Sequence, residues 1–206
     1  MDRRELLKKV ALLTGGVVIG SEFFLSGCTA GGKAEAGFTP SNIAFLDEVG
    51  ETILPATSSP GAKAAQVGEF MKVFVTDCYT KEQQDAFLKG INELDKTAET
   101  MHGKSFMDCS PEQRHSLLLS VEKEAKLHNE NVEKQNNRSR EDLKEQNKEN
   151  DFVALPNHYY TMMKQLTLLG FFTSKPGSTQ ALRHMPVPGK YDGALPYKKG
   201  DKAWAE

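Results

Sequence analysis

The sequence is poor in cysteine, has no surplus of positive charge, and begins with only a short hydrophobic run. Its 206 residues include three cysteines, too few for the disulfide framework of a small secreted domain. The formal net charge of −2 at pH 7 argues against a nucleic-acid-binding protein, which needs a basic surface. The apolar stretch at residues 10–20 falls short of the roughly 20 residues that a membrane-spanning helix needs.

Familiar catalytic and cofactor motifs are also missing. The sequence has no glycine-rich dinucleotide loop, no P-loop, no Gly-x-Ser-x-Gly nucleophile motif and no Cys-x-x-Cys-His haem site. Its five histidines form no pair with the spacing of an established metal motif. Glu112 and His115 are three residues apart, but such a pair on an amphipathic helix is usually solvated. We therefore expect no catalytic residue, no metal site and no cofactor in this chain.

The N-terminus has the pattern of an export signal. Arg3 and Arg4 precede the apolar stretch at residues 10–20, and the sequence LSGC then ends at Cys28. The run RRELLK, which contains both arginines, resembles the twin-arginine signal of proteins that cross a membrane in the folded state. LSGC resembles a bacterial lipobox, in which Cys28 is acylated.

These features predict a signal peptide at residues 1–27 and a flexible, Gly- and Ala-rich tether at residues 28–38. A triacylated cysteine is a stable membrane anchor, so we expect an exported, membrane-anchored lipoprotein facing the periplasm. Two alternatives stay open at this point: export by the general route, and a buried or anchoring N-terminal helix.

The remainder of the chain, residues 39–206, is predicted to be all-α. Apolar residues recur at helical spacing after Thr39 or Ser41, from Val67 to Cys78, and after the potential cap residues Thr80 and Ser110. A further helix that follows Pro156 is apolar on nearly all sides and is therefore expected at the centre. The pattern indicates a small domain of about five helices, followed by an irregular Pro/Gly-rich C-terminal tail.

Residues 128–151 form a polar insert in which only Val132 and Leu143 are apolar. Such a segment cannot offset its ordering entropy by burial. It is either an exposed helical extension or a mobile insert.

The C-terminal tail, residues 174–206, is rich in proline and glycine but also carries aromatic side chains that favour an interface. We expect it to bind a partner through Tyr191, Tyr197 and Trp204. The loop within residues 55–70 would contribute Pro55, Pro60 and Gly61 to that surface. The alternative is that the tail covers the helical core of its own chain.

Cys78 and Cys109 allow three states: two buried free thiols, an intramolecular disulfide, or a bond to a partner protein. The helix predicted between them, of about 20 residues or roughly 30 Å, makes the intramolecular bond difficult. No nucleophilic role follows from either residue.

Three stretches resemble the gluconate 2-dehydrogenase subunit 3 family. They are the export signal, ETILPATSSPGAKAAQVGEF at 51–70, and LTLLGFFTSKPGSTQALRHMPVPGKYDGALPY at 166–197. The combination of Ile-Leu-Pro-Ala-Thr with Pro-Gly-Ala, and of Pro-Val-Pro-Gly-x-Tyr-x-Gly near the end, is unusual. The polar insert at 128–151 and the lipobox depart from the pattern of that family.

The resemblance implies a non-catalytic small subunit of a membrane-associated sugar or polyol dehydrogenase. In that family FAD is bound by a large subunit of the glucose-methanol-choline type, and electrons often pass to a c-type cytochrome subunit. The small subunit carries the twin-arginine signal and supports folding and export of the large subunit, which has none. A free-standing envelope lipoprotein that acts as a binding module, and an enzyme with an unrecognised site, are the alternatives.

Overall fold

The computed structural model describes residues 37–187, 189, 193–196 and 198–205. The predicted signal peptide and most of the tether, together with Cys28, Arg3 and Arg4, therefore lie outside the described residues. Within the described part of the chain, no helix is both long and apolar enough to cross a membrane.

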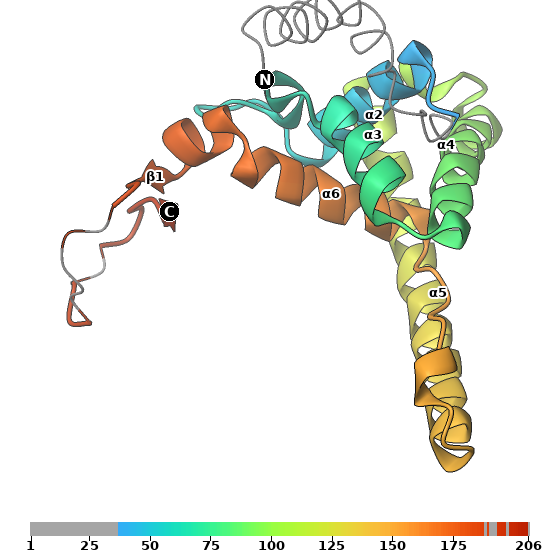
Figure 1. The fold of residues 1–206 in the computed structure, drawn as a ribbon. Coiled ribbons are helices and arrows are strands. Elements are labelled where there is room, and N and C mark those ends of the chain that lie inside the picture. Colours follow the sequence, from blue (N-terminus) through green and yellow to red (C-terminus); the bar gives the residue numbers. More distant parts are fainter. Residues whose placement is uncertain (1–36, 188, 190–192, 197, 206) are drawn as a thin grey trace, which may run out of the picture. The chain divides into compact units, whose positions relative to one another are not determined.

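Five α-helices form the described domain (Figure 1), as the sequence predicted. They are α2 (Pro40–Ile53), α3 (Val67–Cys78), α4 (Lys81–His102), α5 (Pro111–Glu145) and α6 (Tyr159–Thr173). Short helical turns connect or follow them: η1 (Ala62–Ala65), η2 (Phe106–Asp108), η3 (Glu149–Asp151) and η4 (Gly177–Ala181). The described strands are β1 (Arg183–His184) and β2 (Trp204–Ala205), which pair in parallel. The all-α prediction is confirmed.

Capping boxes begin three of the helices at the residues that the sequence indicated. The hydroxyl groups of Thr39, Thr80 and Ser110 each accept a hydrogen bond from the backbone N–H three residues later. The amide side chain at that third position bonds back to the backbone N–H of the cap residue in all three. Two orphan helix donors are thereby satisfied at each start, which is why these boundaries are fixed locally.

Helix α6 lies at the centre of the domain and contacts α2, α3, α4 and α5. Two glycines let its neighbours approach. A Cβ atom added to Gly90 of α4 would lie 2.2 Å from the Cβ of Tyr159, and one added to Gly170 would lie 2.6 Å from the ring of Phe70. The fully buried side chains around it include Leu46, Met71, Phe87, Leu94, Leu117, Met163 and Phe171.

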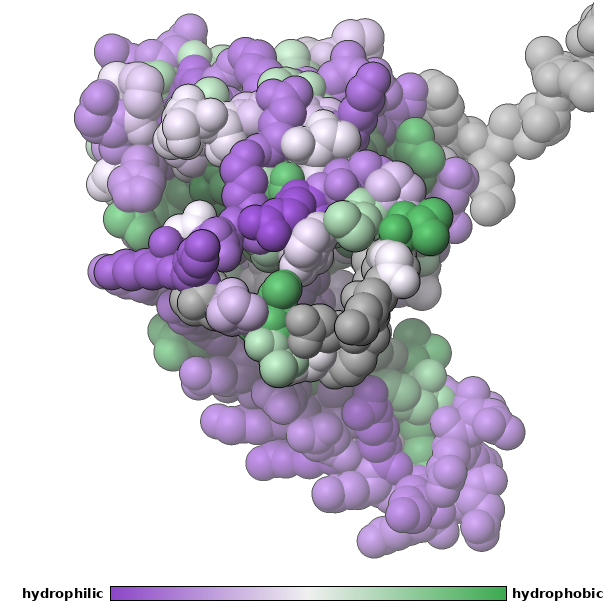
Figure 2. All heavy atoms as spheres, turned by 90° about the vertical axis from the view of Figure 1, so that its left-hand side faces the viewer, coloured by the Kyte–Doolittle hydropathy of each residue, from purple (hydrophilic) through white to green (hydrophobic). Residues whose placement is uncertain are grey.

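The polar insert continues α5 to Glu145 as one unbroken helix, so the helical extension is the correct alternative for most of it. Figure 2 shows this extension, at the bottom of the picture, as largely hydrophilic. The chain then returns beside α5. The Asn136 side chain accepts a hydrogen bond from the backbone N–H of Leu155 (2.9 Å), and the Arg140 guanidinium lies 4.5 Å from the ring centroid of Phe152.

Asn129 joins the returning segment to the start of α6. Its side-chain oxygen accepts a hydrogen bond from the backbone N–H of His158 (2.9 Å), and its amide donates to the hydroxyl group of Thr161 (2.8 Å). The buried His158 caps α6, because its Nδ1 accepts from the backbone N–H of Tyr160 at 3.3 Å. This cap requires an unprotonated Nδ1.

The His158 cap predicts a loss of stability in acid. Burial, followed by the nearby charge of His128, lowers the pKa of His158 from its usual 6.5, while Glu124 and Glu93 oppose the shift. Because the unfolded chain then binds the proton more readily, the free energy of unfolding should fall as the pH drops below about 6.5.

His158→Asn keeps a residue that is favoured at helix starts and removes the titrating group. Chemical denaturation between pH 5 and pH 8 should therefore show a weaker pH dependence for His158→Asn than for the unaltered protein. His184→Asn, at an exposed position, is the control. Identical pH profiles for the unaltered protein and His158→Asn would refute this role.

Candidate partner-binding surface

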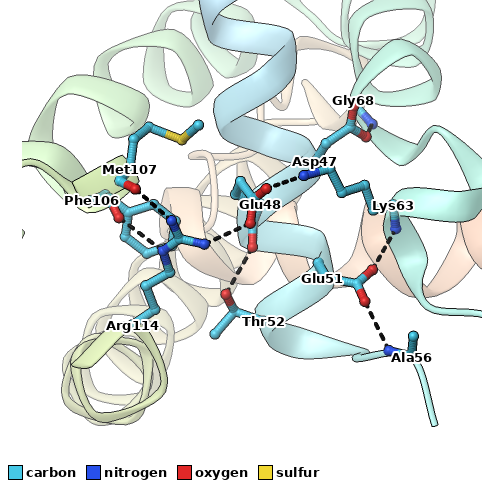
Figure 3. A network of polar contacts seen from close by, with 10 residues as sticks. All are labelled: Asp47, Glu48, Glu51, Thr52, Ala56, Lys63, Gly68, Phe106, Met107 and Arg114. Carbon is cyan, nitrogen blue, oxygen red and sulfur yellow. Dashed lines mark hydrogen bonds and ion pairs between the residues drawn. The ribbon is translucent and has the colours of Figure 1, made fainter. Parts of the chain in front are cut away.

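A network of carboxylates on α2 fixes the loop between α2 and α3, which contains Pro55, Pro60 and Gly61 (Figure 3). Glu51 accepts hydrogen bonds from the backbone N–H groups of Ala56 (2.8 Å) and Lys63 (2.9 Å). Asp47 accepts from the backbone N–H of Gly68 (2.8 Å) in the first turn of α3. Anionic groups at this end of a helix also interact favourably with its dipole.

Glu48 occupies the centre of this network. One carboxylate oxygen accepts from the ammonium of Lys63, and the other lies 2.6 Å from the guanidinium of Arg114 on α5. Arg114 also donates to the backbone carbonyls of Phe106 (2.9 Å) and Met107 (2.6 Å). The loop, α2, η2 and α5 are therefore joined through one carboxylate.

Both acidic groups carry shifted pKa values. The hydrogen bond from Lys63, helped by the charges of Lys63 and Arg114, lowers the pKa of Glu48 despite its partial burial. Burial raises the pKa of Asp47, and the hydrogen bond from Gly68 only partly offsets this effect. Glu48 thus stays ionised under mildly acidic conditions and keeps both cations in place.

The three predicted loop residues differ in exposure. Pro55 is exposed and Pro60 is half-buried, whereas Gly61 is buried. A Cβ atom at Gly61 would lie 2.3 Å from the carboxylate of Glu51 and 2.6 Å from the backbone nitrogen of Ala56. Gly61 therefore serves the packing of the loop itself, and a contact with a partner stays a prediction for Pro55, Pro60 and Gly61.

Trp204 is the described member of the three predicted aromatic anchors; Tyr191 and Tyr197 lie outside the described residues. It is 46% exposed, and its ring lies 4.5 Å from the guanidinium of Arg183. Its neighbours in the tail are exposed as well: Met185 (37%), Val187 (79%) and Leu195 (57%). Each of these side chains thus presents apolar surface to solvent, and the alternative that the tail covers the helical core of its own chain stays open.

Sequence reasoning missed an exposed face on α6. Its even apolar distribution indicated a helix buried on all sides, yet Leu168, Leu169 and Phe172 are 38–42% exposed. We call these three residues the α6 stripe. Phe172 follows Leu169 by three residues and Leu168 by four, which places the three on one side of the helix. The sequence contained that spacing, but apolar residues on the other faces concealed it.

Open grooves flank the ion pair between Glu122 of α5 and Lys164 of α6 (2.8 Å). The larger one, of about 270 Å³, is bordered by Tyr160, Thr161 and Leu168. The Lys164 hydrogen bond lowers the pKa of Glu122, and burial raises that of Tyr160 to about 12. The side chains at these grooves offer hydrogen bonding and apolar contact.

The structure also shows the environment of the Glu112–His115 pair and of the two described cysteines. Glu112 and His115 are both exposed, as expected for a solvated pair. Cys78 is an exposed free thiol and Cys109 a buried one, so the prediction of two buried thiols is wrong for Cys78. Over the described residues, no group of three or more His, Cys, Asp or Glu side chains is arranged to hold a metal ion.

Comparison with known proteins assigns the chain to a protein family. Residues 40–189 match the family described as gluconate 2-dehydrogenase subunit 3. This region includes the 51–70 stretch and most of the 166–197 stretch in which the sequence resemblance was seen. Searches of curated proteins and of solved structures each gave no match.

The Glu48 network gives a prediction for stability. Glu48→Gln leaves the guanidinium of Arg114, whose side chain is 15% exposed, without its counter-charge. We expect a loss of about 2 kcal/mol in the free energy of unfolding at pH 7, less than for a fully buried pair because both side chains keep some contact with solvent. Because the pKa of Glu48 is lowered in the folded state, this contribution is present above about pH 4.5 and is lost as the pH falls further.

The matched control is Asp85→Asn, which removes the exposed Lys81–Asp85 pair on α4. That change should cost at most about 0.5 kcal/mol. Urea denaturation of both variants at pH 7 provides the measurement. Equal losses in the two variants would contradict a central role for Glu48.

Proposed function

Because the chain belongs to the gluconate 2-dehydrogenase subunit 3 family, we propose that it is the non-catalytic small subunit of an exported, flavin-dependent sugar or alcohol dehydrogenase. In this proposal the large subunit, of the glucose-methanol-choline type, binds FAD and oxidises the substrate. The small subunit supports its folding, export and membrane attachment. A c-type cytochrome subunit is a further candidate member of the complex.

The observation that carries the proposal is the exposure of large apolar side chains on the tail and on the neighbouring end of α6. Val187, Leu195 and Trp204 are 79%, 57% and 46% exposed. Each residue of the α6 stripe is about 40% exposed. Figure 2 views the side of the molecule that carries the tail, where hydrophobic residues stand at the surface among hydrophilic ones. Apolar groups gathered in this way are typical of protein–protein contacts.

We propose that the loop after α2 belongs to the same surface. Prolines and the Glu51 hydrogen bonds restrict its backbone, so little entropy is lost when it binds. We propose that Pro55 and Pro60 contact the large subunit together with Tyr191, Tyr197 and Trp204. Exposed apolar side chains support a protein-binding surface more than a small-molecule site, which is usually a concave pocket.

The partner surface is tested by Val187→Ala combined with Leu195→Ala. Since both side chains are exposed, the melting temperature of the isolated protein should change little. Flavin that co-purifies with the chain from native membranes should fall about tenfold, because two apolar contacts are removed. The control is Leu127→Ala on α5, where the side chain is 65% exposed.

Two outcomes would count against this surface. A lower melting temperature that accompanies the loss of flavin would indicate that the tail covers its own core. Absence of flavin from the material purified with the unaltered chain would refute the dehydrogenase proposal itself.

The export role rests on Arg3 and Arg4. If the chain carries its partner through the twin-arginine route, replacing both arginines by lysine should leave both proteins in the cytoplasm. Cell fractionation with detection of this chain and of flavin provides the measurement. Normal export of both proteins would exclude the carrier role, and retention of this chain alone would show that the partner has its own route.

The membrane attachment rests on Cys28. Mass spectrometry of the protein from its own membranes should show a mature chain that begins at an acylated Cys28. Cys28→Ser should release the protein into the soluble periplasmic fraction, since acyl chains supply the anchor. An intact N-terminus at Met1, or an unmodified Cys28, would refute the lipoprotein assignment.

A further inference from the structure

The ends of the segment 186–202 are brought together at the base of the tail. The backbone N–H of Arg183 donates to the carbonyl of Ala203 (2.8 Å), and that of Met185 donates to the carbonyl of Ala205 (2.9 Å). These bonds pair β1 with β2 in parallel, with Arg183 opposite Trp204. The segment between the strands is therefore closed at its base.

Side chains reinforce this closure. The guanidinium of Arg183 lies 4.5 Å from the ring centroid of Trp204. The ammonium of Lys202 donates to the backbone carbonyl of Gln180 in η4. We call the Arg183–Trp204 stack, together with the Lys202–Gln180 bond, the clasp.

The clasp is connected to the helical core through η4. The backbone N–H of Leu182 donates to the carbonyl of Gly177 (3.0 Å), and Gly177 is buried against the end of α6. A Cβ atom at Gly177 would lie 1.9 Å from the carbonyl oxygen of Phe171. The packing of η4 against α6 therefore fixes where β1 lies, and the clasp holds β2 beside β1.

Strand pairing alone is a weak explanation for this closure. Each strand has two residues, and even a complete isolated hairpin is marginal in water. Closing the intervening segment also costs loop entropy. Because Arg183 and Trp204 are both exposed, core burial contributes little to the closure. The stack between the cation and the aromatic ring contributes a modest attraction at this exposed site.

We propose that the clasp holds the tail in the conformation that the partner subunit binds, so that Arg183 and Trp204 set the affinity by preorganising Val187 and Leu195. This inference rests on the proposed function. It assigns Arg183 a positioning role, and it gives Trp204 a positioning role in addition to the partner contact proposed above. Ordering a chain before it binds removes that entropy cost from the association step. The family match ends at residue 189, so β2, which completes the clasp, lies outside the matched region.

The test replaces the stack by a covalent bond. Neighbouring strands lie about 4.8 Å apart, which is within the Cα separation of roughly 4.4–6.8 Å that a disulfide spans. The double variant Arg183→Cys/Trp204→Cys, made with Cys78→Ser to remove the exposed thiol, lacks both side chains of the stack but can close the same base. Mass spectrometry establishes its oxidised and reduced forms.

The readout is the flavin that co-purifies with the full-length chain from native membranes. Trp204→Ala should lower it about tenfold, and Trp204→Phe, which keeps an aromatic face for Arg183, should retain most of it. The oxidised double variant should recover to within about threefold of the unaltered chain, and reduction should abolish that recovery. Lys199→Ala in the same tail is the control.

Amide hydrogen exchange gives an independent readout in the isolated protein. The N–H groups of Arg183 and Met185 should exchange faster in Trp204→Ala than in the unaltered chain or in Trp204→Phe, because they donate across the clasp. The emission of Trp204, the one tryptophan in the sequence, should also change in Arg183→Ala.

Several results would overturn the proposal. An oxidised double variant that binds as weakly as Trp204→Ala would show that closing the base of the tail does not restore binding. Unchanged exchange at Arg183 and Met185 in Trp204→Ala would show that the stack does not close the base. If Trp204→Ala retains as much flavin as the unaltered chain, the clasp proposal alone is refuted. If no flavin co-purifies with the unaltered chain, the proposed function is refuted as well.

Discussion

Close contact between α6 and four other helices is the constraint on which the rest of the domain depends. A helix of 15 residues can touch that many neighbours only if some approach at backbone distance. Gly90 and Gly170 make this possible at Tyr159 and Phe70. The same closeness requires a firm start for α6, and Asn129 with His158 supplies it through three hydrogen bonds.

The charged network around Glu48 complements this apolar centre. Three carboxylates on α2 each bind a different part of the chain: Asp47 the start of α3, Glu48 the cations of Lys63 and Arg114, and Glu51 the backbone of the loop. The loop keeps its conformation through these bonds, since Pro55 and the residues around it are exposed and contribute little burial. A recognition loop can be exposed and still ordered when its backbone donors are satisfied in this way.

The sequence predicted what local chemistry determines. Thr80 and Ser110 were predicted as cap residues, and Thr39 was one of two candidates with Ser41. Gly103 ends α4 with a positive φ of 69°. Contacts between distant residues escaped prediction. Asn129 and Asn136 looked like members of a solvated polar run, but each bonds a segment 19 or more residues away.

The candidate surface was predicted only where composition indicates it, and the parts that depend on tertiary contacts were missed. Composition identified the tail as rich in aromatic and apolar residues, and the structure shows Val187, Leu195 and Trp204 at the surface. The α6 stripe could not be separated from the core by periodicity, because that helix is apolar on its other faces too. Pairing between β1 and β2 spans about 20 residues of sequence, and no pattern of two-residue strands signals it.

The exposed apolar residues of the tail depend on the helical core for their position. Apolar residues that stay exposed in a folded chain keep an unfavourable contact with water, and natural sequences retain such patches where another surface covers them. Here the exposed residues lie beyond η4, on a segment whose base is tied to the buried end of α6. The helical domain therefore acts as a rigid support that determines where the tail begins, while the clasp determines where it ends. Fixing both points narrows the conformations available to the apolar residues between them, which lowers the entropy cost of the partner binding proposed above.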